Sequence, residues 1–314
     1  MSVIDLAFPS ATGDARIHAS IYLPVAVRTR ALVLFAHDIT EHHRRHLSLI
    51  TRLTEAGYAV AALDMPGHGL TAEPNDSWGR ASASGDDIVD DVRRLAARAM
   101  RRVPDVPLLL FGHGWGSLAL RASMPSAAGQ VSGAVFSGTY AAVPGLRDAY
   151  AHVLGEVQAS GAESATSALE VVFQAFSARV GGRSPLDWRT ANDTLRASLE
   201  ADPLCRPASE MSAGLVAGFL DLALRVNSDE WAEDVPRGVP TLFLSGDRDA
   251  AGDFGAGVYA AANTLVDAGC RTVRTQLLTD ARHDLLHEPA VAEGVIDFFN
   301  EALAITSGKR IRRR

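Results

Sequence analysis

Residues 106–116, Val-Pro-Leu-Leu-Leu-Phe-Gly-His-Gly-Trp-Gly, join a short apolar run directly to a glycine-rich turn. The apolar run, residues 106–111, is typical of a strand buried in a parallel sheet. The next five residues fit the pattern Gly-x-Ser-x-Gly, in which a sharp strand-to-helix turn presents a nucleophilic serine. They fit it everywhere except at the centre, which holds Gly114. The sequence therefore predicts a nucleophile turn that lacks its nucleophile.

Two further buried strands are predicted at residues 239–245 and 272–278, and each leads into a polar loop. The first loop carries Asp247 and Asp249, and the second carries His283. The order of turn, acid and histidine along the chain is that of a serine catalytic triad on such a sheet. In a triad the imidazole takes the nucleophile's proton and the carboxylate orients the imidazole. We predict that His283 is the base, that Asp249 is the acid, and that Asp247 braces its turn.

The rest of the chain alternates between strand and helix patterns. A helix is predicted from about Ser84, with Asp86 and Asp87 in its first turn, where acids favour the helix dipole. This alternation predicts an α/β fold: a mainly parallel sheet with helices on both faces. Four more strands are predicted at residues 17–23, 31–36, 59–63 and 133–137.

The alternation stops between residues 139 and 237, where alanine-rich helical patterns dominate. We predict that residues 1–138 and 238–305 form the core and that residues 139–237 form a helical lid inserted into it. Residues 306–314 form a basic C-terminal tail. Within the lid, a helically spaced apolar stripe either lines an acyl pocket as a substrate-binding surface or packs inside the lid. Its members are Met211, Leu215, Phe219 and Leu222.

Several ordered motifs resemble the monoacylglycerol lipase and lysophospholipase branch of the α/β-hydrolases, which is often grouped with serine aminopeptidases. The similar stretches cover nearly the full chain. The resemblance implies an α/β-hydrolase fold with a lid, and the lineage of a carboxylic ester hydrolase. The stretches are residues 37–42 (His-Asp-Ile-Thr-Glu-His), 57–60, 64–69 (Asp-Met-Pro-Gly-His-Gly), 202–205, 245–249 and 281–288.

The resemblance also implies an oxyanion hole made by the backbone N–H groups of Ile39 and Trp115. Preorganised donors of this kind contribute about 2.7–4 kcal/mol each to transition-state stabilisation. Asp38 departs from the family pattern, which has glycine there. Because loop carboxylates are mostly solvated, we expect the Asp38 side chain to point away from the site.

Three functions remain open for a chain with Gly114 at the turn. The first is an ester hydrolase whose serine activity is lost, since glycine adopts the strained turn easily. The second is a pseudo-hydrolase that binds a lipid-like or small ester ligand. The third is an enzyme in which His283 activates a water in place of the serine. Ser117 lies three residues into the predicted helix, too far around it to substitute.

The 314 residues are 47% hydrophobic and 21% charged, which is typical of a globular protein. The net charge of −7 argues against a nucleic-acid partner. Two cysteines and no recognisable signal peptide or apolar membrane span favour a cytoplasmic protein. The basic tail leaves peripheral membrane contact open. No cofactor or metal is predicted, although the i, i+4 pair His42 and His46, beside His43, is a weak zinc pattern.

Overall fold

The computed structural model describes residues 1–13, 15–127 and 129–308. Its central sheet has eight strands in the order β1-β2-β4-β3-β5-β6-β7-β8. Neighbouring strands pair in parallel along the stretch β4-β3-β5-β6-β7-β8. At the other edge, β1 pairs with β2 and β2 pairs with β4 in antiparallel orientation. The predicted α/β fold is confirmed. The strands are β1 (Ser2–Pro9), β2 (Arg16–Leu23), β3 (Ala31–Ala36), β4 (Tyr58–Leu63), β5 (Leu108–His113), β6 (Val131–Ser137), β7 (Thr241–Gly246) and β8 (Val273–Leu278).

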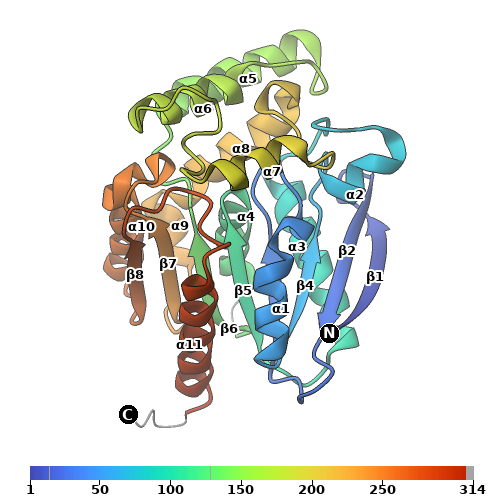
Figure 1. Ribbon diagram of the computed structural model, residues 1–314, viewed down its shortest axis with the longest axis vertical. Coiled ribbons are helices and arrows are strands. Elements are labelled where there is room, and N and C mark those ends of the chain that lie inside the picture. The colour runs from blue at the N-terminus through green and yellow to red at the C-terminus, as the bar shows by residue number, and fades with distance from the viewer. Residues whose placement is uncertain (14, 128, 309–314) are drawn as a thin grey trace.

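The helices cover both faces of the sheet (Figure 1). They are α1 (Leu47–Glu55), α2 (Gly69–Ala72), α3 (Gly85–Arg102), α4 (Trp115–Ser123), α5 (Leu146–Ser160), α6 (Ala168–Arg179), α7 (Asp193–Ala201), α8 (Ala213–Val226), α9 (Asp229–Asp234), α10 (Ala256–Asp267) and α11 (Pro289–Thr306). Short 3-10 turns are η1 (His43–His46), η2 (Glu73–Asn75), η3 (Met124–Ala127), η4 (Ala208–Glu210) and η5 (Ala250–Gly255).

Two apolar cores lie on opposite faces of the sheet. Leu53 of α1 and Phe299 of α11 share one core with Phe35 of β3. Leu95 of α3 and Leu118 of α4 share the other with residues of β3 and β5. Because the inner parallel strands are covered on both sides, they read as largely apolar runs, whereas the edge strand β8 has partly buried and exposed residues.

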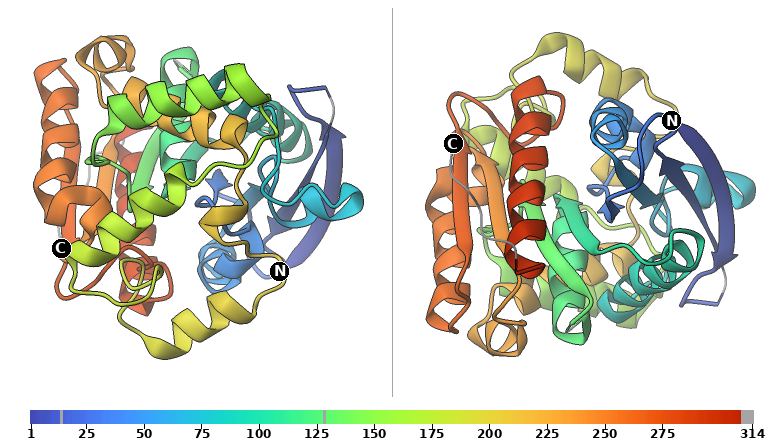
Figure 2. Two further views of the ribbon diagram at one scale, coloured as in Figure 1. Left: turned by 90° about the horizontal axis from the view of Figure 1, so that it is seen from above. Right: turned by 90° about the horizontal axis from the view of Figure 1, so that it is seen from below.

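The helices α5 and α6 lie beyond the carboxyl ends of the parallel strands, at the top of Figure 1 and facing the viewer in the left view of Figure 2, and α7 lies below them at the front of Figure 1. This is where the insertion predicted over residues 139–237 would lie, although its limits stay a prediction. The helix α8 lies between this layer and the sheet's helices, because it packs against α5 on one side and against α3 and α4 on the other.

The sequence pattern does not predict β1, whose residues alternate between exposed and partly buried at the sheet edge. At the other end of the chain, α11 ends at Thr306, and most of the predicted basic tail, residues 309–314, lies outside the described residues. Within the described ranges, no helix is long and apolar enough to cross a membrane.

Candidate active site

The glycine-rich turn has the geometry of a nucleophile turn. β5 ends at His113 and α4 begins at Trp115, so Gly114 alone makes the reversal, with φ 53° and ψ −119°. This strained region of backbone conformation is one that glycine adopts far more readily than other residues. The Gly114 N–H donates to the Ser137 carbonyl of β6, which fixes the turn at 2.9 Å.

The predicted base and acid lie together above this turn. Asp249 follows β7, where one carboxylate oxygen accepts from the Ala251 N–H at 3.0 Å and caps η5. Its other oxygen, Oδ2, lies 3.0 Å from His283 Nδ1. Both side chains are fully buried. The hydrogen-bonded carboxylate is therefore that of Asp249, while the catalytic roles remain predictions.

Asp38 does not point away from the site, so that expectation is wrong. The side chain is fully buried and faces Gly114. A Cβ built on Gly114 would overlap the Asp38 carboxyl group. The missing side chain at position 114 thus leaves the space that the carboxylate fills. Three donors compensate the cost of burying this charge, which the solvation argument did not anticipate.

Those donors come from three different parts of the chain. The Trp115 N–H donates to Asp38 Oδ1 at 2.7 Å. The Tyr140 hydroxyl lies 3.2 Å from each carboxylate oxygen. His283 Nε2 lies 3.2 Å from Oδ2. One carboxylate oxygen of Asp38 therefore faces the histidine, and the other accepts from the backbone donor.

The predicted oxyanion-hole residues, Ile39 and Trp115, are both fully buried beside the turn. The Trp115 N–H that the resemblance assigns to an oxyanion is already bonded to Asp38. Its position at the first residue of α4 adds the positive end of the helix dipole. The chain's own carboxylate occupies this anion site.

Arg189, which the sequence analysis missed, connects the site to two further buried acids. Its Nη2 lies 3.0 Å from Glu41 Oε2, 3.0 Å from Asp284 Oδ1 and 3.4 Å from Asp38 Oδ2. Its Nη1 donates to the Thr40 hydroxyl at 3.0 Å. One guanidinium therefore forms ion pairs with three carboxylates, as its fork of five donors permits.

Signals for these missed residues existed in the motifs. Glu41 belongs to the block at residues 37–42, and Asp284 directly follows His283. Tyr140 comes three residues after β6, at the same sheet edge as the turn. Arg189 had no such signal, because it lies in the loop between α6 and α7 and reaches the site only through the tertiary fold.

The charges around His283 control its protonation. Burial disfavours the imidazolium, but Asp249 and Asp38 outweigh burial and raise the pKa of His283 to about 10. Burial would likewise raise the pKa of Asp38, but His283 and Arg189 lower it below its usual value. Desolvation, with the nearby Asp38 charge, raises the pKa of Tyr140 well above its usual range. At neutral pH the site thus holds an imidazolium–carboxylate pair and a neutral phenol.

The serine nearest the turn is engaged elsewhere. Ser117 Oγ donates to the Gly114 carbonyl at 2.5 Å and is fully buried on α4. Its hydroxyl points back along the helix rather than toward His283, as its position in the sequence predicts.

The apolar stripe of the predicted substrate pocket lies in the main core. Met211, Leu215 and Phe219 are fully buried in the cluster that includes α3 and α4. Phe219 packs edge-on against Tyr140, with ring centroids 4.8 Å apart. These residues are not among those that line the cavity beside Arg189, and their pocket role stays a prediction.

The histidines of the weak zinc pattern bind separate carboxylates. His42 Nε2 lies 3.0 Å from Asp202, and His46 Nε2 lies 2.7 Å from Glu41. His43 forms a third pair, 2.6 Å from Asp64. The three side chains are thus directed to three different partners.

Among the residues that the structure describes, three other groups have ligand atoms close enough to share a metal ion. The one at the site joins Asp38, His113 and His283. The Arg189 guanidinium beside Asp38 already supplies positive charge there, which disfavours an added cation. The remaining groups are His18–His43–Asp64 and His42–Asp202–Cys205.

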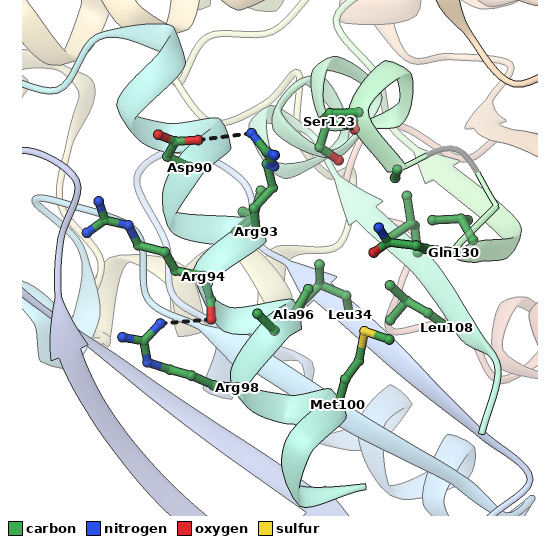
Figure 3. Close-up of a pocket in the computed structure, with 16 residues that line it drawn as sticks. Leu34, Asp90, Arg93, Arg94, Ala96, Arg98, Met100, Leu108, Ser123 and Gln130 are labelled. Carbon is green, nitrogen blue, oxygen red and sulfur yellow. Dashed lines mark hydrogen bonds and ion pairs between the residues drawn. The ribbon is translucent and has the colours of Figure 1, made fainter. Parts of the chain in front are cut away.

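The cavity nearest to the site has a volume of about 410 Å³ and lies between α6, α7 and η4. Thr40 and Arg189 form its inner wall, and Phe173 and Leu186 contribute apolar surface. Another cavity, of about 580 Å³, is lined by Met100 at the end of α3 and by the amino ends of β5 and β6 (Figure 3). It is therefore far from the candidate site, which lies at the carboxyl ends of these strands.

A family model described as serine aminopeptidase, S33 matches residues 27–290. The monoacylglycerol lipase of Mycolicibacterium smegmatis (strain ATCC 700084 / mc(2)155) is 30% identical over 126 residues. That match covers 40% of this chain and 43% of the relative, so it spans less than half of the relative's length.

Solved structures are similar over nearly the whole chain. A highly thermostable carboxyl esterase from Bacillus coagulans, in complex with glycerol, has a TM-score of 0.91 and 30% identity, covering 96% of this chain and 99% of that one. A lipase in its open form has a TM-score of 0.87 and 27% identity, with coverages of 96% and 99%. A monoglyceride lipase variant from Saccharomyces cerevisiae shares the fold at 17% identity and a TM-score of 0.72, covering 99% of this chain and 97% of that one.

Proposed function

The chain belongs to the serine aminopeptidase S33 family of α/β-hydrolases, and from this esterase and lipase lineage we propose a member that has lost serine-based ester hydrolysis. One observation carries the proposal: the Asp38 carboxylate fills the space beside Gly114 that a nucleophilic side chain would need. Asp38 and Gly114 are thus complementary in shape.

The electrostatics of His283 argue against a simple water-activating enzyme. A general base must accept a proton near the operating pH. With its pKa raised to about 10, His283 already carries that proton at neutral pH. Its Nε2, the nitrogen that would face a water, is engaged with Asp38. The resting site therefore has no free base to activate water.

Ligand binding without turnover is a second candidate, favoured by the cavity beside Arg189. Its volume of about 410 Å³ is within the range of small-molecule sites. Three acids already neutralise Arg189 on its inner wall, so the cavity suits a neutral ester better than a carboxylate. A monoacylglycerol of medium chain length has this chemistry.

The proposal is tested with the unmodified protein on p-nitrophenyl esters from acetate to decanoate and with a fluorophosphonate probe. We expect neither labelling nor turnover above that of the His283→Ala variant. Ester turnover that His283→Ala abolishes, or a labelled serine, overturns the proposal.

Binding is measured by calorimetry with 1-monodecanoylglycerol and with decanoate. Binding of the ester that Leu186→Asp abolishes, with weaker binding of decanoate, supports the second candidate. Equal binding to the Leu186→Asp variant places the ligand outside the cavity and contradicts it.

A further inference from the structure

We propose that Asp38 is a carboxylate nucleophile that opens an epoxide through a covalent ester with this chain. The proposal rests on the proposed loss of serine chemistry, and it names the reaction that the same site can perform. It starts from one juxtaposition: Asp38 Oδ2 lies 3.2 Å from His283 Nε2, while Oδ1 accepts from the Trp115 N–H at 2.7 Å.

The carboxylate has the surroundings that a covalent mechanism requires. A carboxylate side chain is an established type of covalent nucleophile. Behind it, His283 is held by Asp249 at 3.0 Å, so the base and its orienting acid are both in place. A site that had merely lost its serine would not need a buried charge at this point, because burying a charge costs free energy.

The Trp115 N–H has a specific task in the second half of such a reaction. Once Oδ2 carries an alkyl group, Oδ1 becomes the carbonyl oxygen of an ester. Attack of water on Cγ places a negative charge on Oδ1, where the Trp115 donor and the N-terminus of α4 already meet it. The oxyanion site then serves an ester of the protein rather than an ester substrate.

The proton balance suits an epoxide. The electron pair of Oδ2 forms a bond to a ring carbon, the ring C–O bond breaks, and the released oxygen takes the proton of the His283 imidazolium. The high pKa of His283 ensures that this proton is present at neutral pH. Tyr140, whose hydroxyl lies 3.2 Å from both Asp38 oxygens, is placed to hydrogen-bond the opening oxygen.

Esterification then changes His283 from an acid into a base. The Asp38 charge that helped to hold the proton is gone, so the His283 pKa falls. His283 takes a proton from water, hydroxide adds to Cγ, and the Cγ–Oδ2 bond breaks to release the diol oxygen. That oxygen recovers the proton from His283, and the new carboxyl group of Asp38 protonates His283 again. The net reaction adds one water to one epoxide.

Esters suit this nucleophile poorly. Attack of a carboxylate on an ester carbonyl forms an anhydride, which is more reactive than the ester it came from. Ring strain, in contrast, drives the opening of an epoxide. The cavity of about 410 Å³ provides space next to the site, with Arg189 between it and Asp38 Oδ2 at 3.4 Å. The Arg189 side chain must therefore move for the substrate to reach Oδ2.

The test is a single turnover of 1,2-epoxyhexane in H₂¹⁸O with the protein in excess. We expect one ¹⁸O atom in the peptide that contains Asp38 and an unlabelled diol, because the diol oxygen comes from Oδ2. A diol that carries ¹⁸O while Asp38 stays unlabelled overturns the proposal. So does the absence of diol with folded protein.

Two variants accompany this measurement. Asp38→Asn should lose all diol formation, whereas Asp91→Asn should keep it, because Asp91 is an equally buried carboxylate bound to Ser10 on another part of the chain. Diol formation by Asp38→Asn also contradicts the proposal. Loss of serine chemistry is tested by ester turnover and fluorophosphonate labelling, whereas this proposal is tested by diol formation and ¹⁸O incorporation. Failure of one can therefore be distinguished from failure of the other.

Discussion

The Asp38 carboxyl group occupies the space into which a side chain at Gly114 would project. The two residues lie 76 positions apart in the sequence, and the ends of the neighbouring strands β3 and β5 bring them together. The Asp38 carboxylate fits only because Gly114 has no side chain and leaves this space open. Their coupling gives the first prediction.

Restoring the serine requires both positions to change. In Gly114→Ser alone the new side chain overlaps Asp38, so we expect a loss of stability of about 1–3 kcal/mol and no fluorophosphonate labelling. In Asp38→Gly with Gly114→Ser, the hydroxyl faces His283 and the Trp115 donor is free. We expect labelling of Ser at 114 and a gain in p-nitrophenyl butyrate hydrolysis on the order of 10³-fold or more.

Urea unfolding gives the stability half of this double-mutant cycle. The double variant should be more stable than the sum of the single changes predicts, because Asp38→Gly removes the clash that Gly114→Ser creates. Labelling of Gly114→Ser alone, or additive stabilities, would show that the two positions are independent.

His283 should depend most on the two carboxylates it contacts. Replacing Asp249 or Asp38 by Asn removes a negative charge within 3.2 Å of the imidazole, so the pKa of His283 should fall in each variant. Asp247→Asn should lower it less. NMR titration of the imidazole resonances measures this ranking, and a larger effect of Asp247→Asn would transfer the acid role to Asp247.

The raised pKa of His283 also predicts how stability depends on pH. Its folded-state pKa of about 10 lies above the ordinary value of 6.5, so the folded state binds the proton more tightly. This contribution to the free energy of unfolding is complete below about pH 6.5 and is lost as the pH rises toward about 10.

Urea unfolding across that range should show stability falling with pH. The same series with His283→Gln should lack this part of the fall. An unchanged slope in the variant would assign the effect to other groups.

Arg189 should be required for the stability of the buried acids. Arg189→Met leaves Asp38, Glu41 and Asp284 without their shared cation, and breaking a buried pair costs about 3–5 kcal/mol. The loss arises because the carboxylates are charged. As the pH falls below about 4 and they become protonated, the difference in the free energy of unfolding between Arg189→Met and the unmodified protein should shrink.

A matched control is Arg196→Met, which breaks a partly exposed pair with Asp187. This variant should lower the free energy of unfolding by no more than about 1 kcal/mol. Equal losses for the two variants in chemical unfolding would contradict a special role for Arg189.

The sequence alone predicts the α/β fold, because the periodicity of its strands and helices is local. The runs at residues 106–111 and 239–245 are apolar throughout since both faces of a parallel sheet are buried. The turn at Gly114 and the loops of Asp249 and His283 follow predicted strands, so their meeting at one sheet edge follows from the topology. The sequence does not predict β1, because the residues of this edge strand are mostly exposed or partly buried and form no clear apolar run.

Only the tertiary structure decides the state of the site. Asp38 follows a strand end, and nothing in the local sequence tells which way its side chain turns. The direction depends on the space left by Gly114, on the donors of Trp115 and Tyr140, and on Arg189. These groups come from three separate segments, and a buried charge is stable only when all of them surround it. The sequence therefore determines where the site forms, and long-range packing determines what occupies it.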